Sequence, residues 1–193
     1  KNLKKKKIIF VTGTRADYGK LKTEILETQK SKRFSTSVFV TGMHNLKIYG
    51  NTWGELRKDK IKNIHRYDNQ KKSNKMDIIL SETIKGFTNY AEKIKPDLIV
   101  VHGDRIEPLA CAIVGSLNNF RVAHIEGGET SGTVDELLRH AISKLSHLHF
   151  VCNQIAKKRL IQMGEKKENI FIIGSPNLDI LLKKKLPTLS ELR

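Results

Sequence analysis

Three short segments of the sequence place charged side chains directly beside glycines. They are Gly13-Thr14-Arg15, His102-Gly103-Asp104-Arg105 and His124-Ile125-Glu126-Gly127-Gly128-Glu129. Glycine lets a backbone come close to a ligand, and an arginine in such a turn suits a phosphate group. Histidine and carboxylate side chains can exchange protons with a bound molecule. The segments therefore indicate a binding crevice for an anionic small molecule.

Each segment also has an ordinary structural explanation. Gly13-Thr14-Arg15 could be no more than a tight strand-to-helix turn, or Arg15 could hold a phosphate group, and the sequence favours these two explanations about equally. Asp104 could cap the next helix, which stabilises a helix by about 0.5–2 kcal/mol. A single histidine at a strand end is more often a core residue than a catalyst. We expect alternation along the strand to point His124 and Glu126 to the same side of the sheet, which favours a functional pair.

A fourth group of candidates lies on a helix expected at 133–146. Asp135 is one turn from Arg139, and Glu136 is one turn from His140. Surface pairs at this spacing stabilise a helix by about 0.2–0.5 kcal/mol. That explanation suffices for Glu136 and His140. Asp135 lies at the helix start beside the glycine loop, and we keep it as a site candidate.

Short β-branched runs alternate with amphipathic stretches along the whole chain. Strands are expected at 7–12, 37–41, 97–102, 121–125, 148–152 and 169–173, and helices at 17–31, 76–95, 107–118, 134–145 and 154–163. Wholly apolar strands such as 98–101 are typical of a parallel sheet covered on both faces. The alternation predicts an α/β fold with right-handed crossovers and a doubly wound, mostly parallel sheet. The irregular region 45–74 is expected to hold a mobile loop.

In such a sheet, ligands bind outside the carboxyl ends of the strands. All the glycine-rich segments follow strands, so we expect Arg15, Asp104, Glu126 and Asp135 to converge around one pocket. The first segment is neither G-x-G-x-x-G nor a P-loop, which disfavours a nicotinamide cofactor.

Composition excludes several other classes of protein. The formal net charge is +16, but the lysines are scattered and aromatic residues make up 6% of the chain, too few for a platform on which nucleic-acid bases could stack. No apolar run reaches the roughly 20 residues that span a membrane. Cys111 and Cys152 form no disulfide framework, which favours the cytoplasm. His147 and His149 lack further ligands at zinc spacing, so no metal is expected.

Several motifs together resemble the hydrolysing UDP-N-acetylglucosamine 2-epimerases of sialic acid biosynthesis and their relatives in legionaminic acid biosynthesis. They are G-T-R-A-D-Y-G-K-L at 13–21, V-T-G-M-H at 40–44, Y-G-N-T at 49–52, V-H-G-D-R at 101–105, H-I-E-G-G-E-x-S-G-T-x-D-E at 124–136 and R-H-A-I-S-K-L-S-H-x-H at 139–149. The similarity runs from about Lys7 to Leu182. Ala16-Asp17 stands where the non-hydrolysing relatives usually carry Pro-Glu, which favours the hydrolysing branch.

The resemblance implies a fold of two Rossmann-like domains, as in glycosyltransferases of the GT-B type, with the active site between them. We expect residues 1–182 to form the first domain and 183–193 to begin a linker or a truncated tail. The second domain, with much of the uridine and diphosphate site, is expected to be absent from this chain.

The resemblance also implies roles for individual residues. The catalytic carboxylates would be Asp104, Glu126 and Asp135, with His124 and Arg139 as close partners. The binding set would comprise Arg15 at the diphosphate or nucleotide, His44 near the substrate, and Gly103, Arg105, Gly127 and Gly128. Crowding is expected to raise the pKa of at least one of the three carboxyl groups.

The implied reaction begins with anti elimination of UDP and loss of the C2 proton, which gives a 2-acetamidoglucal. Water then adds with C2 inverted, and a free mannosamine-type sugar is released. Asp104 or Glu126 would be the base, and no metal or redox cofactor is implied. UDP-N-acetylglucosamine and UDP-N,N′-diacetylbacillosamine both remain open as substrates, and a homo-oligomer is open as well. The alternatives are a nucleotide-sugar binding or assembly module without turnover, and half of a GT-B glycosyltransferase.

Overall fold

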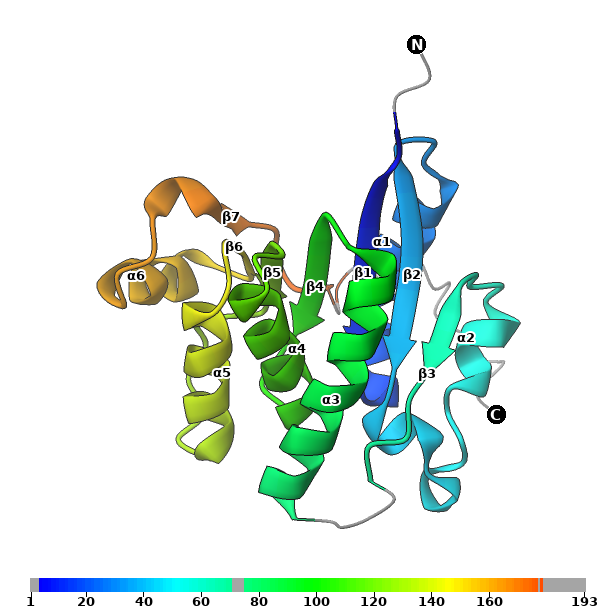
Figure 1. Cartoon of the computed structure of the whole chain (residues 1–193). Coiled ribbons are helices and arrows are strands. Elements are labelled where there is room, and N and C mark those ends of the chain that lie inside the picture. Colours follow the sequence, from blue (N-terminus) through cyan, green and yellow to red (C-terminus); the bar gives the residue numbers. More distant parts are fainter. Residues whose placement is uncertain (1–3, 71–74, 177, 179–193) are drawn as a thin grey trace, which may run out of the picture.

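The computed structural model describes residues 4–70, 75–176 and 178 of the chain (Figure 1). Its centre is a seven-stranded sheet in the order β3-β2-β1-β4-β5-β6-β7, and every neighbouring pair is parallel. The strands are β1 (Lys6–Thr12), β2 (Phe34–Val40), β3 (Ile64–Arg66), β4 (Leu98–His102), β5 (Val122–Ile125), β6 (Leu148–Val151) and β7 (Ile170–Ile172). The predicted α/β fold with a doubly wound parallel sheet is confirmed.

Helices cover both faces of the sheet. They are α1 (Arg15–Lys30), α2 (Gly54–Lys58), α3 (Met76–Ile94), α4 (Ile106–Leu117), α5 (Val134–Lys144) and α6 (Gln154–Gln162), with 3-10 turns at Gly42–Asn45, Lys47–Tyr49 and Lys167–Asn169. Figure 1 shows α3, α4 and α5 in front of the sheet and α1 behind it. None of the described helices combines the length and the apolar character needed to cross a lipid bilayer.

Each face of the sheet has its own apolar core. On one face, Phe87 of α3 and Ile142 of α5 are fully buried in the same cluster as Ile99 of β4. On the other face, Leu21 and Ile25 of α1 are fully buried in a second cluster. The burial of apolar surface, which stabilises a fold by about 25 cal/mol per Å², holds these layers together. The strand ends are therefore fixed on a rigid base.

The expectation of a mobile loop is wrong for residues 45–70. This stretch contains α2 and the edge strand β3, which pairs with β2 through Val38, Phe39 and Val40. Leu56 of α2 is fully buried in the second cluster, and His65 of β3 stacks on Tyr90 with ring centroids 4.2 Å apart. A strand of three residues and a helix of five are too short to produce a hydrophobic pattern that can be recognised in the sequence. Residues 71–74 lie outside the described residues, as does the expected domain boundary after residue 182.

The chain reverses direction across the sheet between β1 and β4. From β1 it moves outward to β2 and β3, and α3 then returns it to β4 on the other side of β1. The parallel register places Thr12 opposite Val40 and His102 opposite Ile125. The loops after these strands consequently open at one edge, which is the position where α/β sheets bind ligands.

Candidate functional site

A pocket of about 320 Å³ opens at this edge of the sheet. Its walls come from the first turns of α1, the end of β4, the loop after β5 and the start of α5. The lining residues are Thr14, Ala16, Asp17, Lys20, His102, Gly103, Asp104, Arg105, Glu126, Glu129, Asp135 and Arg139. Three of the four residues expected to converge, Asp104, Glu126 and Asp135, do so.

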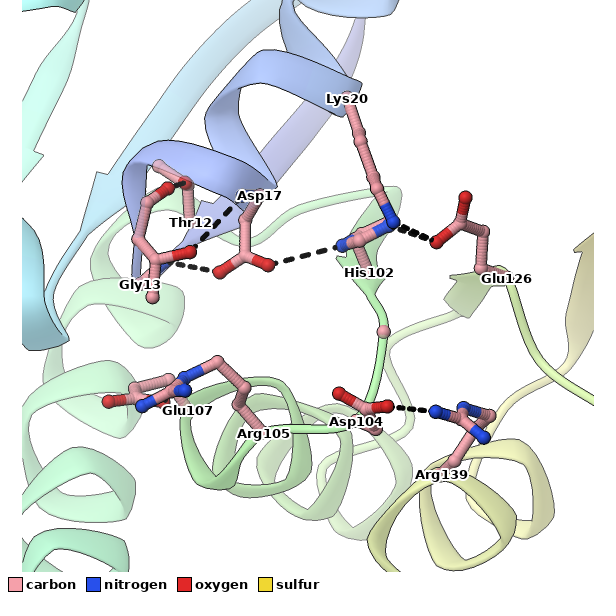
Figure 2. Close-up of polar contacts among 12 residues, drawn as sticks. Thr12, Gly13, Asp17, Lys20, His102, Asp104, Arg105, Glu107, Glu126 and Arg139 are labelled. Atoms are coloured by element: carbon pink, nitrogen blue, oxygen red, sulfur yellow. Dashed lines mark hydrogen bonds and ion pairs between the residues drawn. The ribbon is translucent and has the colours of Figure 1, made fainter. Parts of the chain in front are cut away.

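A buried histidine connects two carboxylates on the α1 side of the pocket. His102 is 4% exposed. Its Nδ1 lies 3.3 Å from Asp17 Oδ1, and its Nε2 lies 2.9 Å from Glu126 Oε2. Lys20 Nζ donates to the same Glu126 oxygen over 2.5 Å. Figure 2 shows Asp17, His102 and Glu126 in a row, with Lys20 reaching Glu126 from α1 above it.

The charges in this row support one another. Burial on its own would lower the pKa of His102, but the hydrogen bonds and negative charges of Asp17 and Glu126 raise it above 6.5. Burial would raise the pKa of Glu126, yet hydrogen bonds from His102 and Lys20 lower it to about 2. The pKa of Asp17 is likewise lowered, because its bond with His102 outweighs burial. Glu126 is therefore not the carboxyl group with the expected raised pKa, since two cations face it, and a raised pKa elsewhere in the pocket stays a prediction.

His124 and Glu126 do not point to the same side. Glu126 has φ +62°, a left-handed conformation that ends the alternation of β5 and turns its side chain toward α1. His124 is fully buried and faces α5, where its Nδ1 lies 3.0 Å from Ser143 Oγ. Its Nε2 lies 2.7 Å from the Gly103 carbonyl oxygen. Burial lowers the pKa of His124 to about 3, so this neutral ring fixes the Gly103 turn from behind the pocket.

Asp104 faces the pocket from the α5 side. It does not cap α4, whose N-cap residue is Arg105 and has no side-chain cap. Instead, Asp104 accepts a hydrogen bond from Arg139 Nη2, and Arg139 Nη1 donates to the Glu129 carbonyl over 3.0 Å. Asp135 lines the same pocket from the start of α5. Arg139 therefore pairs with Asp104 and not with Asp135, which lies one turn before it on the same helix.

Arg15 and His44 lie away from this pocket. Arg15 is exposed, and its Nε pairs with Glu55 over 2.8 Å in a neighbouring groove. His44 is fully buried, with its ring nitrogens 3.0 Å from Thr12 Oγ1 and 2.8 Å from Thr52 Oγ1. Burial lowers its pKa to about 4. Arg15 is the first residue of α1 and His44 lies in the 3-10 turn after β2, but neither lines the wall that holds the carboxylates.

The paired glycines after Glu126 have a packing role. A Cβ on Gly127 would lie 2.8 Å from both His124 Nδ1 and Ser143 Oγ, and one on Gly128 would lie 2.5 Å from the Ala156 carbonyl. Neither glycine lines the pocket. Gly103, which has φ +75°, does line it. The close packing of this loop on α5 and α6 places Glu126 and Glu129 at the pocket wall.

Four lining residues with titratable side chains are absent from the predicted site: Asp17, Lys20, His102 and Glu129. Asp17 lies in the first turn of α1, where an acidic residue is common for structural reasons alone. Lys20, three residues later, shares its helix face, and this spacing was an available signal. His102 follows Leu98 and Val100 at two-residue spacing in β4, so the three side chains point to the same face of the sheet, which is the α1 side. Within the described part of the chain, no group of three or more His, Cys, Asp or Glu side chains could hold a metal ion.

Comparisons with known proteins point in one direction. Residues 26–192 match the protein-family model described as UDP-N-acetylglucosamine 2-epimerase. A protein of that name from Neisseria meningitidis serogroup B is 45% identical over 97% of this chain and 50% of its own length. The UDP-N,N′-diacetylbacillosamine 2-epimerase (hydrolyzing) of Legionella pneumophila is 46% identical over 95% of this chain and 49% of its own length. The chain thus spans about half the length of these curated relatives.

A solved structure agrees with this match. The crystal structure of UDP-GlcNAc 2-epimerase from Neisseria meningitidis bound to UDP-GlcNAc superposes with a TM-score of 0.82 and 26% identity. The match covers 91% of this chain and 48% of that one.

Proposed function

Because this chain belongs to the UDP-N-acetylglucosamine 2-epimerase family, we propose that its pocket acts on the sugar of a UDP-linked 2-acetamido hexose. The proposed reaction is that of a hydrolysing 2-epimerase, which releases UDP and a free sugar inverted at C2. One observation carries this proposal: Asp104, Glu126 and Asp135, from three separate segments, line one pocket.

The chemistry needs a proton acceptor and a proton donor at C2. In the first step, a base removes the C2 proton, the C1–O bond to the diphosphate breaks, and the electron pair forms the C1=C2 double bond of a glucal. In the second step, the oxygen of water bonds to C1 and one of its protons passes to solvent, while a proton adds to C2 on the face opposite to the one that lost its proton, which inverts C2. Two proton-transfer groups on different sides of the sugar are therefore required.

The two clusters of the pocket supply such groups. In Figure 2, Asp104 with Arg139 lies below the end of β4, and Glu126 with His102 lies above it. A carboxylate with a pKa of about 2 is a weak base, so we assign removal of the C2 proton to Asp104. Glu126 would pass a proton from the protonated His102 to the opposite face of C2. His102 would then regain a proton from solvent, and Asp104 would release to solvent the proton that it took from C2.

Arg139 has a supporting role in this scheme. Its guanidinium would orient Asp104, because one of its nitrogens donates to Asp104 and the other is fixed on the Glu129 carbonyl. Asp135, at the pocket rim, would steady positive charge that develops at C1 as the diphosphate departs. The proposed partner is the nucleotide sugar. Two free cysteines, Cys111 and Cys152, are compatible with the proposed cytoplasmic location.

The experiment incubates the chain with UDP-N-acetylglucosamine and, separately, with UDP-N,N′-diacetylbacillosamine, and measures UDP and free sugar. Turnover that falls 100-fold or more in Asp104→Asn and Glu126→Gln supports the proposal. Accumulation of glucal in Glu126→Gln would support its role in the second step. The nucleotide sugar from which UDP is released faster is the preferred substrate.

The alternative function is that of a module whose pocket binds a nucleotide sugar without turning it over. Binding of the UDP-sugar by calorimetry, with no UDP released, would favour this binding module over the enzyme. Transfer of the sugar to an added acceptor would favour a glycosyltransferase instead.

A further inference from the structure

Glu107, in the first turn of α4, is a buried acid that the scheme above does not use. It is 1% exposed. Removing an ionised carboxylate from water is costly unless a cation or hydrogen bonds compensate it. The Oε2 atom is buried and accepts no hydrogen bond among the described residues. Its ion-pair partner is Arg105, whose Nε lies 3.5 Å away.

The Glu107 carboxyl group is fixed by the turns after β1 and β2. A Cβ on Gly42 would lie 2.6 Å from Glu107 Oε1, and one on Gly13 would lie 3.3 Å from its Cδ. Gly42 also has φ +60°, which an ordinary residue rarely adopts. Glu107 therefore fills a space that only two glycines leave open, and it has little freedom to move.

Arg105 differs from the other cations of the pocket. Lys20 and Arg139 use their charged nitrogens on Glu126 and Asp104. Arg105 contacts Glu107 through Nε alone. Its two terminal nitrogens have no hydrogen-bond or ion-pair partner in the part of the chain that the structure describes. They are donors at the pocket wall that are free to hold an anion.

We propose that Glu107 is a positioning residue, which fixes Arg105 through Nε so that its terminal nitrogens meet the diphosphate of the substrate. This inference rests on the proposed function, because it assumes a nucleotide-sugar ligand. A guanidinium binds phosphate oxygens best with two parallel N–H bonds, so its orientation matters as well as its charge. Without the buried carboxylate, the Arg105 side chain would sample several rotamers and lose that geometry.

The test measures binding of UDP, inorganic pyrophosphate and uridine by calorimetry to the unaltered chain, Glu107→Gln, Arg105→Gln and the double variant. Glutamine keeps the shape of Glu107 and removes only its charge. We expect Glu107→Gln to weaken UDP and pyrophosphate about tenfold and to leave uridine unchanged. Since Glu107 acts through Arg105, the double variant should bind UDP no more weakly than Arg105→Gln alone.

Asp97→Asn is the matched control. It also removes a carboxylate from an ion pair, with Lys6 over 2.9 Å, but at the opposite edge of the sheet. Its UDP affinity should equal that of the unaltered chain. Thermal unfolding of every variant checks that it is folded. If Glu107→Gln does not fold, Glu107→Asp takes its place in the binding experiment, because the shorter side chain keeps the charge but moves it away from Arg105.

The outcomes separate this inference from the proposed function. UDP affinity that is unchanged in Glu107→Gln or Glu107→Asp, an equal loss for uridine, or additive losses in the double variant would overturn the inference alone. An unaltered chain that binds neither UDP nor pyrophosphate would overturn the proposed function and the inference together.

Discussion

Replacing His102 with glutamine is expected to destabilise the folded chain by about 2–3 kcal/mol near pH 6. The change removes a charged donor from two carboxylates, Asp17 and Glu126. Hydrogen bonds to charged groups contribute about 1.5–3 kcal/mol each, and glutamine restores one neutral bond. The lowering of the Glu126 pKa from 4.5 to about 2 corresponds to about 3 kcal/mol, which His102 shares with Lys20.

The pH dependence gives this prediction a specific form. Because the folded-state pKa of His102 is raised above 6.5, its stabilisation is complete below that value and is lost as the pH rises through the folded-state pKa. The pKa values of Asp17 and Glu126 are lowered from 3.8 and 4.5. Their stabilisation is present above those values and is lost as the pH falls through the folded-state ones. The difference between the two proteins should be largest between about pH 4.5 and 6.5.

Urea denaturation at half-unit steps from pH 3 to pH 9 measures this difference directly. His147→Gln is the matched control, because His147 is exposed and its amide replacement can still accept from the Val122 N–H. That control should lie within about 0.5 kcal/mol of the unaltered chain. A His102→Gln variant that is equally stable at pH 6, or whose deficit does not change with pH, would refute the proposed charge network.

Two further predictions concern other parts of the site. Gly42→Ala should destabilise the fold by about 1–3 kcal/mol in thermal unfolding, because a Cβ at this position, where φ is +60°, would lie 2.6 Å from Glu107 Oε1. The control Gly19→Ala, at an open helical position, should stabilise the fold by up to about 1 kcal/mol. Equal effects of the two changes would contradict the packing described for Gly42. Arg139→Gln should reduce kcat for UDP release about 100-fold, because the change leaves Asp104 without its cation, and the affinity for UDP should change by less than a factor of two. An unchanged kcat would show that Arg139 has no part in the proposed reaction.

The strands and the edge that carries the site could be predicted because their signals are local. Apolar runs such as Leu98–Val101 are complete within a few residues. The glycines and charges that follow them lie at the carboxyl ends of parallel strands wherever the sheet is built. Asp104 and Glu126 were located in this way, and both line the pocket.

The direction of individual side chains could not be predicted, because it depends on neighbours distant in sequence. Arg15 turns to Glu55, a partner on α2 that no local pattern connects to it. Lys20, in the next turn of the same helix, reaches Glu126 instead. The positive φ of Glu126 reversed the expected alternation with His124, although the following glycines had signalled an irregular backbone.

The most direct test of the proposed reaction follows the hydrogen at C2 of the sugar. The chain is incubated with UDP-N-acetylglucosamine in deuterium oxide, and the released sugar is examined by proton NMR. Elimination and rehydration predict one deuterium at C2 of a product inverted at that carbon, together with one equivalent of UDP. A released sugar that retains its original C2 hydrogen, or a bound nucleotide sugar from which no UDP is released, would contradict the proposal.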